Sequence, residues 1–187
     1  SNPAAGSRKL RSLIERRKAS FVVGSVHSGI MLASIPIATE LKTPYFSAGE
    51  ATEATGSKGS RYSFRTGTDT YALAAAGAPW AFKNLGKTWT MIFPDYAWGH
   101  SHHQEHKKLI ESLGGKVNDP IAVPLGTKDL VPYLSKIPKN TEVLFSVFFG
   151  ALSVAFYTQQ KAMRLDEKMK MYSVSGTIEC IDPRDIG

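Results

Sequence analysis

Four histidines stand close together in the sequence: His100, His102, His103 and His106. On a helix, His102 and His106 share one face, and two imidazoles at this spacing can chelate a transition metal. The pattern is HxxxH without the glutamate of HExxH, and no further ligands follow at metal spacing. We therefore expect an exposed polar helix face, with adventitious metal binding as the alternative, and no resident metal or other cofactor.

The sequence offers no recognisable nucleophile. Cys180 is the single cysteine and lies in Glu179-Cys180-Ile181, without a CxxC partner or a cationic neighbour that would make it reactive. No GxSxG elbow, Walker A sequence or dinucleotide-binding GxGxxG is present. These observations favour a protein that is not an enzyme.

Aromatic and hydroxyl side chains gather where predicted strands end. They are Tyr96, Trp98, Phe148, Phe149, Ser28 and Thr52. Such residues could wall a ligand pocket, with the aromatic rings on one side and the hydroxyls on the other. Packing in the core is the alternative for the aromatic residues, and their spacing does not decide between the two.

Short apolar segments alternate with amphipathic ones along the chain. Strands are predicted at 20–24, 43–47, 62–66, 87–93, 142–149 and 169–174, with 117–123 also extended. Helices are predicted at 3–17, 28–38, 70–85, 100–113, 129–137 and 151–164, with Ser28 as the cap of the second. The 20–24 run is typical of a parallel strand covered on both faces. The pattern predicts α/β architecture with mostly parallel sheets, whose ligands bind at the carboxyl ends of the strands.

The charge is concentrated at the start of the chain. The 187 residues carry a net charge of +7, and residues 1–20 hold six Lys and Arg against Glu15 alone. A protein that tracks phosphates spreads its cations over a face or groove, so we expect a solvated helix and no nucleic-acid partner. No run reaches the ~18 apolar residues of a membrane span. Residues 1–20 also lack a signal-peptide pattern, which predicts either a cytoplasmic protein or a mature or trimmed chain.

Several motifs, taken in order, resemble type I periplasmic binding proteins of the branched-chain amino acid transporter group. The first are Asn2-Pro3-Ala4 before a basic helix, residues 21–28 (FVVGSVHS) and residues 43–48 (TPYFSA). They are followed by residues 61–70 (RYSFRTGTDT), 95–101 (DYAWGHS), 114–117 (GGKV) and 124–130 (PLGTKDL). The resemblance implies two Rossmann-like lobes with parallel sheets flanked by helices. Because members are nearly twice as long, this chain resembles a central fragment: residues 1–65 an incomplete lobe one, residues 66–187 most of lobe two, and an interlobe crossing near 64–67.

The resemblance also implies a ligand site. Ser28 would bind a ligand carboxylate together with the N–H groups at a helix start, a site that favours anions. Gly49 would supply a backbone contact, and Ala51 or Thr52 occupies the position of a hydroxyl ligand. The aromatic positions of the family correspond to Trp98 and Phe149.

The loop that begins at Ser175 departs from the family pattern. Amino-acid binders of the group commonly carry an acidic residue there for the ligand ammonium, whereas this chain has Ser175-Gly176-Thr177. Burying an ammonium without a counter-charge is costly, so we expect the ligand to be an organic acid, with aromatic acids among the candidates. A branched-chain amino acid or an amide is the competing ligand.

The implied function is that of an extracytoplasmic, periplasmic solute-binding protein of an ABC importer. It would close about a hinge on a small ligand and dock on the membrane permease, without changing the ligand. Two alternatives stay open. One is a ligand-sensing domain of a receptor or regulator, and the other is an α/β enzyme whose catalytic groups lie in other segments, with His100 or Asp95 as acid or base.

Overall fold

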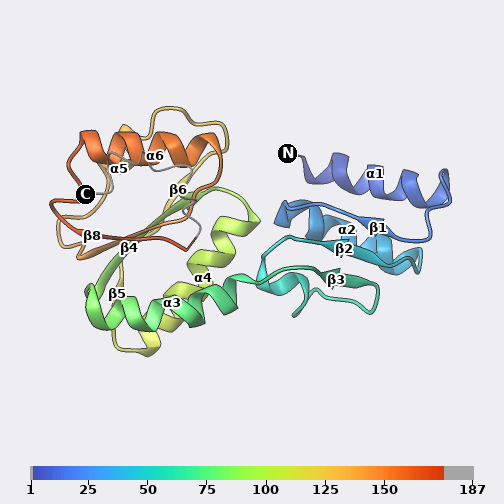
Figure 1. Ribbon diagram of the computed structural model, residues 1–187, viewed down its shortest axis with the longest axis horizontal. Helices are drawn as coiled ribbons and strands as arrows, with labels where there is room; N and C mark the ends of the chain where they lie inside the picture. The colour runs from blue at the N-terminus through green and yellow to red at the C-terminus, as the bar shows by residue number, and fades with distance from the viewer. Residues whose placement is uncertain (1, 175–187) are drawn as a thin grey trace. The chain divides into compact units, whose positions relative to one another are not determined.

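The computed structural model describes residues 2–174, which form two compact units (Figure 1). Unit 1 comprises residues 1–73 and unit 2 comprises residues 74–187. The boundary falls inside helix α3 (Thr70–Asn84), so one helix contains residues of both units. None of the helices within residues 2–174 is long and apolar enough to cross a membrane.

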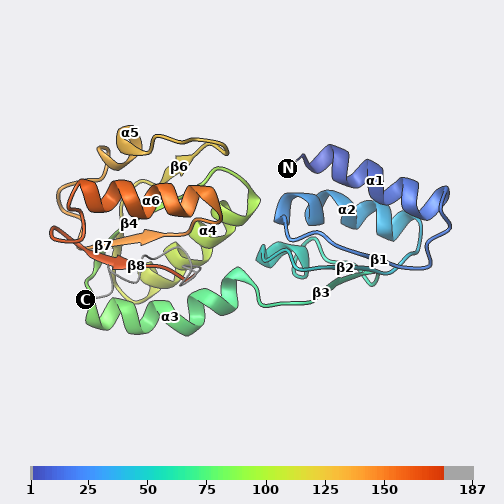
Figure 2. The same cartoon turned by 45° about the horizontal axis from the view of Figure 1, so that its top comes forward.

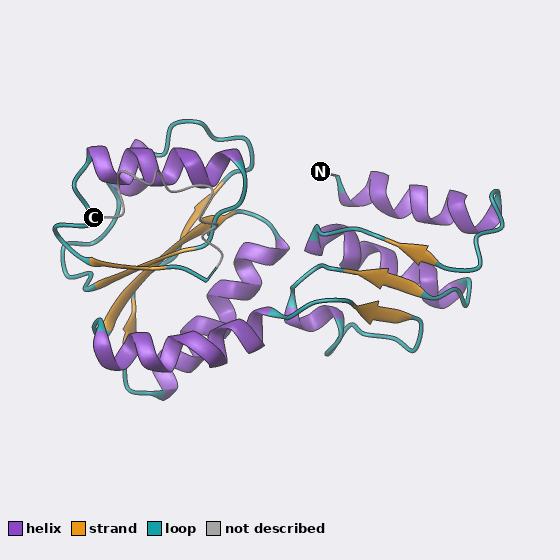
Figure 3. Ribbon diagram, in the orientation of Figure 1, coloured by secondary structure: helices purple, strands orange, loops and turns teal. Residues whose placement is uncertain are grey.

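Unit 1 is a parallel sheet of three strands in chain order, β1-β2-β3. Its elements are α1 (Pro3–Glu15), β1 (Val22–Val23), α2 (Ser28–Glu40), β2 (Tyr45–Ser47), the 3-10 helix η1 (Thr52–Ala54) and β3 (Ser63–Arg65). Figure 3 shows the helices beside these strands. The parallel pairing confirms the predicted α/β class.

The two helices of unit 1 start at side-chain caps. Asn2 Oδ1 accepts the N–H of Ala5 at 3.2 Å, with Pro3 at the first helical position, as the sequence predicts. The prediction that Ser28 caps α2 is wrong. His27 caps this helix through Nδ1, which accepts the N–H of Ile30 at 3.3 Å, and Ser28 is the first helical residue.

The cations of the first twenty residues lie mostly on the exposed surface of α1 and just after it. Arg11 forms ion pairs with Glu15 at 3.0 Å and with Glu40 of α2 at 2.5 Å. The hydrogen bond from Arg11 holds the pKa of Glu40 below its usual value. The helix is therefore attached to α2 through charged pairs and through buried Leu10, and its other cations are solvated.

One face of the unit 1 sheet carries an exposed aromatic row. Tyr45 packs with residues of α1 and α2 on the covered face, whereas Val23, Phe46 and Phe64 are aligned by the strand register on the other. The rings of Phe46 and Phe64 stack with centroids 5.0 Å apart. Val23 is 70% exposed and Phe64 42%. The expectation that the first strand is covered on both faces is wrong. Both α1 and α2 pack on the face that carries Tyr45, and Val23 on the other face is exposed.

Unit 2 is built on a second parallel sheet, in the order β5-β4-β7-β8 with β6 also paired to β4. After α3 come β4 (Thr88–Pro94), α4 (Ala97–Ser112), β5 (Lys116–Val117), β6 (Ile121–Val123), α5 (Val131–Leu134), β7 (Val143–Ser146), α6 (Ala151–Ala162) and β8 (Lys170–Tyr172). The predicted extended segment 117–123 is two short strands that pair one after the other with β4. Asn118, Asp119 and Pro120 separate them.

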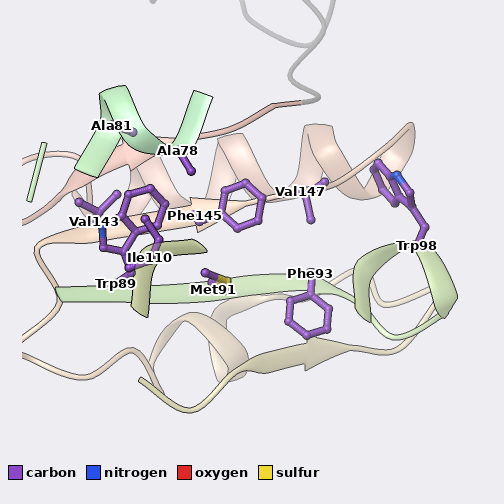
Figure 4. Packing of buried hydrophobic residues seen from close by; sticks show 10 residues of the cluster. All are labelled: Ala78, Ala81, Trp89, Met91, Phe93, Trp98, Ile110, Val143, Phe145 and Val147. Atoms are coloured by element: carbon purple, nitrogen blue, oxygen red, sulfur yellow. The ribbon is translucent and has the colours of Figure 1, made fainter. Parts of the chain in front are cut away.

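Both faces of the unit 2 sheet are covered. Figure 4 shows the cluster on one face, where Trp89, Met91 and Phe93 of β4 meet α3 and α4. On the other face Ile92 and Leu144 pack with residues of α5 and α6. Figure 2 shows α6 and α3 on opposite sides of the strands. The sheet is thus the middle layer of three.

Candidate functional site

The loops after β1, β2 and β3 lie at one edge of the unit 1 sheet, because parallel strands end at the same edge. Hydrogen bonds tie these loops together. The N–H of Ala48 donates to the carbonyl of Ser25 at 3.1 Å, and that of Thr66 donates to the carbonyl of Ser47 at 3.0 Å. This edge brings together the four candidate residues of unit 1, namely Ser28, Gly49, Ala51 and Thr52.

Ser28 holds the loop that follows β2. Its side-chain oxygen Oγ accepts the N–H of Glu50 at 3.2 Å and of Ala51 at 3.3 Å. Because a hydroxyl has two lone pairs and one proton, the proton is what Ser28 can still donate to a carboxylate. The residue is fully buried in this structure, so a ligand in contact with the hydroxyl would have to uncover it.

Gly49 and Ala51 pack against the start of α2. A Cβ at Gly49 would lie 3.0 Å from Met31 Sδ and 3.2 Å from Ser28 Cα, which is tighter than ordinary side-chain contacts. Ala51 is fully buried. The loop therefore needs small residues to lie this close to the helix.

Thr52 and Arg65 attach the same loop to the segment after β3. Thr52 Oγ1 hydrogen-bonds Thr70 Oγ1 at 2.8 Å and accepts the N–H of Tyr71 at 3.0 Å. Arg65 donates to the carbonyl of Ala51 at 3.0 Å. Arg65 is not among the site residues predicted from the sequence. The signal for it is strand alternation, which places Arg65 on the same sheet face as buried Ser63.

In unit 2 the candidate residues Tyr96 and Trp98 stand where β4 passes into α4. The helix begins at Ala97, three residues earlier than predicted, and Gly99 in its first turn lies directly on the end of the strand. A Cβ there would lie 2.2 Å from the carbonyl oxygen of Pro94, so this close approach requires glycine. Trp98 is buried in the core cluster, with its ring 6.0 Å from that of half-buried Tyr96.

Phe148 and Phe149 follow β7 and take opposite environments. Phe148 is 3% exposed and packs on Phe156 of α6 with ring centroids 5.1 Å apart. Phe149 is 75% exposed. Of this pair only Phe149 is exposed, while Phe148 has the core position that the spacing left open. Ser175 lies outside the described residues.

The expectation of an exposed histidine face on α4 is wrong for two of the four histidines. His102 and His106 are fully buried, and His106 stacks on Phe145 with ring centroids 4.2 Å apart. His106 Nδ1 donates to the carbonyl of His102 at 2.8 Å, and burial lowers the pKa of His106 to about 3. A neutral imidazole packs as an aromatic ring. The signal was the four-residue spacing of the buried set Trp98, His102, His106 and Ile110.

Adventitious metal binding is the alternative that the sequence leaves open for the four histidines. Residues 2–174 contain no group of three or more His, Cys, Asp or Glu side chains that could hold a metal ion. Exposed His100 instead pairs with Asp95, with Nε2 and Oδ1 2.7 Å apart. This pair stands beside Tyr96 at the carboxyl end of β4.

Two parallel α/β units with loops gathered at the carboxyl edge of each sheet define a Rossmann-like ligand-binding class. Residues 1–183 match the family model described as periplasmic binding protein. The chain belongs to this family. The comparison with curated proteins found no match.

Solved structures show the same fold. A periplasmic binding protein from Burkholderia mallei is 25% identical, with a TM-score of 0.90 over 96% of this chain and 48% of that one. A solute-binding protein of an ABC transporter from Rhodopseudomonas palustris BisB5, in complex with 3,4-dihydroxybenzoic acid, is 25% identical with a TM-score of 0.80 over 92% and 48%. One from R. palustris with 4-hydroxybenzoate is 24% identical with a TM-score of 0.82 over 92% and 47%. The chain spans about half the length of these proteins.

Proposed function

We propose that the chain is part of an extracytoplasmic solute-binding protein of an ABC importer, and that its ligand is a small aromatic carboxylic acid. The observation that carries this proposal is the likeness, at 25% identity, to a solute-binding protein solved with 3,4-dihydroxybenzoic acid. The loops at the carboxyl edge of the unit 1 sheet support it, because this edge is where open α/β sheets bind ligands.

The carboxylate would bind to unit 1. The start of α2 is a helix N-terminus, whose N–H groups and dipole favour an anion. Ser28 would add the proton of its hydroxyl, since both lone pairs already accept loop N–H groups. Gly49 and Ala51 would let the ligand approach the backbone closely, and Thr52 would keep the loop in place.

The aromatic ring would bind to residues of unit 2. Tyr96, Trp98 and exposed Phe149 stand at the carboxyl ends of the paired strands β4 and β7. Phe148 would support Phe149 from the core. The sequence Ser175-Gly176-Thr177 adds an argument against an α-amino acid, because it has no carboxylate for the ammonium.

The ligand would be captured by hinge closure of two lobes and then delivered unchanged to the membrane permease of the transporter. Residues 1–65 would belong to lobe one and residues 66–187 to lobe two, with the crossing near 64–67. In this proposal the protein is not an enzyme, so ligand incubated with it is recovered intact.

A thermal-shift panel tests the ligand class. We expect benzoate, 4-hydroxybenzoate and 3,4-dihydroxybenzoate to raise the melting temperature, and leucine and benzamide to leave it unchanged. Ser28→Ala should abolish the shift. Ser34→Ala is the matched control, because Ser34 is also buried in α2 and lies six residues further along this helix than Ser28. A shift with leucine and none with the aromatic acids would contradict the proposal.

A further inference from the structure

Arg65 is a charged side chain kept almost entirely from solvent. It ends β3, and its side chain is only 7% exposed. A guanidinium is always charged, and burying it is unfavourable unless its N–H groups are satisfied. The partners of Arg65 therefore show what the fold uses it for.

Those partners belong to two different segments. Nη1 donates to the carbonyl of Glu50 at 3.2 Å and of Ala51 at 3.0 Å, and Nη2 donates to Thr55 Oγ1. These three residues lie in the loop that follows β2. Nη2 also pairs with Asp69 Oδ2 at 3.2 Å, in the segment that leads into α3.

The same two segments are joined a second time through side chains at the start of α3. Asp69 Oδ1 accepts the N–H of Ala72 at 2.7 Å, which caps the helix. Thr52 Oγ1 bonds Thr70 Oγ1 and accepts the N–H of Tyr71. The loop, Arg65 and the first turn of α3 are thus one hydrogen-bonded assembly.

Helix α3 continues from this assembly without interruption. Its first turn, up to Leu73, belongs to unit 1. Its later turns belong to unit 2 and contribute Ala78 and Ala81 to the core there. A movement of residues 50–55 therefore acts on α3, which contains residues of both units.

We propose that Arg65 is a positioning residue that couples the ligand loop to the start of α3. It holds the carbonyls of Glu50 and Ala51 with one nitrogen and the capping residue Asp69 with another, so the loop and the helix end move together. In this proposal Arg65 acts on the ligand through the loop, by holding its backbone carbonyls. That the loop binds a ligand rests on the proposed function, whereas the coupling itself is a property of the hydrogen bonds.

Hydrogen exchange of the unliganded protein tests the coupling. In Arg65→Lys, which keeps the charge but not the forked geometry, exchange of the Ala51, Tyr71 and Ala72 amides should rise together by about tenfold, as expected from losing one hydrogen bond to a charged group. Thr52→Val removes only the hydrogen bonds of the Thr52 hydroxyl to Thr70 and Tyr71, and it should also raise exchange at Tyr71 and Ala51. The Met31 amide in α2 is the internal control, and its exchange should stay unchanged. A general loss of stability would raise its exchange as well.

Arg61→Gln is the matched control, because Arg61 is an exposed arginine four residues away that stacks over Tyr62. It should leave all of these amides unchanged. Faster exchange at Ala51 without a change at Tyr71 and Ala72, or no change at all, would overturn the proposal.

Ligand titration separates this inference from the proposed function. With 3,4-dihydroxybenzoate, Arg65→Lys should bind about tenfold more weakly than the wild type, while Arg61→Gln binds equally well. If the wild type binds and Arg65→Lys binds with the same Kd, the inference is overturned and the proposed function stands. If the wild type binds none of the aromatic acids, the proposed function fails and the exchange data still decide the coupling.

Discussion

The two sheets of the molecule are covered differently. The unit 2 sheet has apolar clusters on both faces, with α3 and α4 on one side and α5 and α6 on the other. The unit 1 sheet has α1 and α2 on one face, while Phe21, Val23, Phe46 and Phe64 line the opposite one. Parallel strands are normally buried on both faces.

The units also hold their candidate site residues by different means. In unit 2 candidate aromatic residues are held by apolar packing, as Trp98 is in the core cluster. In unit 1 the loop after β2 is held by polar side chains, above all Ser28, Thr52 and Arg65. Hydrogen bonds fix a loop geometrically without a deep core, so unit 1 can position its candidate site even though, among residues 2–174, α1 and α2 cover one face of its sheet and the other is exposed.

The largest expected effect comes from truncating one phenylalanine in each sheet, buried Phe145 in unit 2 and half-buried Phe46 in unit 1. Phe145→Ala should lower the free energy of unfolding of unit 2 by about 3–5 kcal/mol, because it leaves a cavity in a fully buried cluster. Phe46→Ala should cost unit 1 only about 1 kcal/mol, mainly the stacking on Phe64. Urea unfolding followed by circular dichroism measures both.

Tryptophan fluorescence separates the two units in that experiment, because Trp80, Trp89 and Trp98, the three tryptophans of the chain, all lie in unit 2. Phe145→Ala should shift the fluorescence transition and Phe46→Ala should not. Equal losses for the two variants would contradict the difference between the sheets.

A smaller effect is expected from pH, and it concerns unit 2. Burial lowers the pKa of His106 to about 3, so between about pH 6.5 and 3 the unfolded chain binds a proton that the folded chain does not. The stabilisation is complete above about pH 6.5 and is lost as the pH falls. At about pH 5 unit 2 should be less stable than at pH 7 by about 2 kcal/mol, at 1.36 kcal/mol per pKa unit.

The measurement is urea unfolding followed by tryptophan fluorescence at both pH values. His106→Phe serves as the control, because it keeps a ring on Phe145 but cannot be protonated, and its stability should depend less on pH. An unchanged pH dependence in this variant would show that His106 is not the titrating group.

The smallest change in stability is expected on the exposed face of unit 1. Phe64→Thr should reduce binding of the dye ANS, because it removes a 42% exposed ring from the aromatic row, while unfolding changes by about 1 kcal/mol or less. Phe149→Thr is the control in unit 2, since it removes a single exposed ring from outside this row. Equal loss of dye fluorescence in both variants would show that the row is not the main apolar surface.

Much of the fold could be predicted from the sequence because its signals are local. The cap at Asn2 and the alternation of apolar strands with helices follow from nearby residues, and both are confirmed. The exposed face of β1 could not be predicted, because Phe21 and Val23 have the residue types of a buried strand. Which face of a parallel strand is covered depends on distant helices.

The candidate site shows the same limit. Strand ends can be read from the pattern, so the position of Ser28, Gly49, Ala51 and Thr52 at one sheet edge could be predicted, while their role in ligand binding stays a prediction. The sequence does not show that Arg65 turns inward to bind that loop, because a charged residue at a strand end is usually solvated. The burial of His102 could not be predicted for a related reason. Histidine is a polar residue, although His102 occupies one position of a buried helix face whose residues are spaced four apart.

Calorimetric titration of the chain with 3,4-dihydroxybenzoate, compared with catechol, is the most direct test of the carboxylate site proposed for unit 1. Catechol keeps the hydroxylated ring and lacks only the carboxylate that unit 1 is proposed to bind. We expect saturable binding of the acid to the wild type, no binding of catechol, and loss of acid binding in Ser28→Ala. Binding of catechol as tight as that of the acid, or tight binding of leucine with no response to the acid, would contradict this proposal.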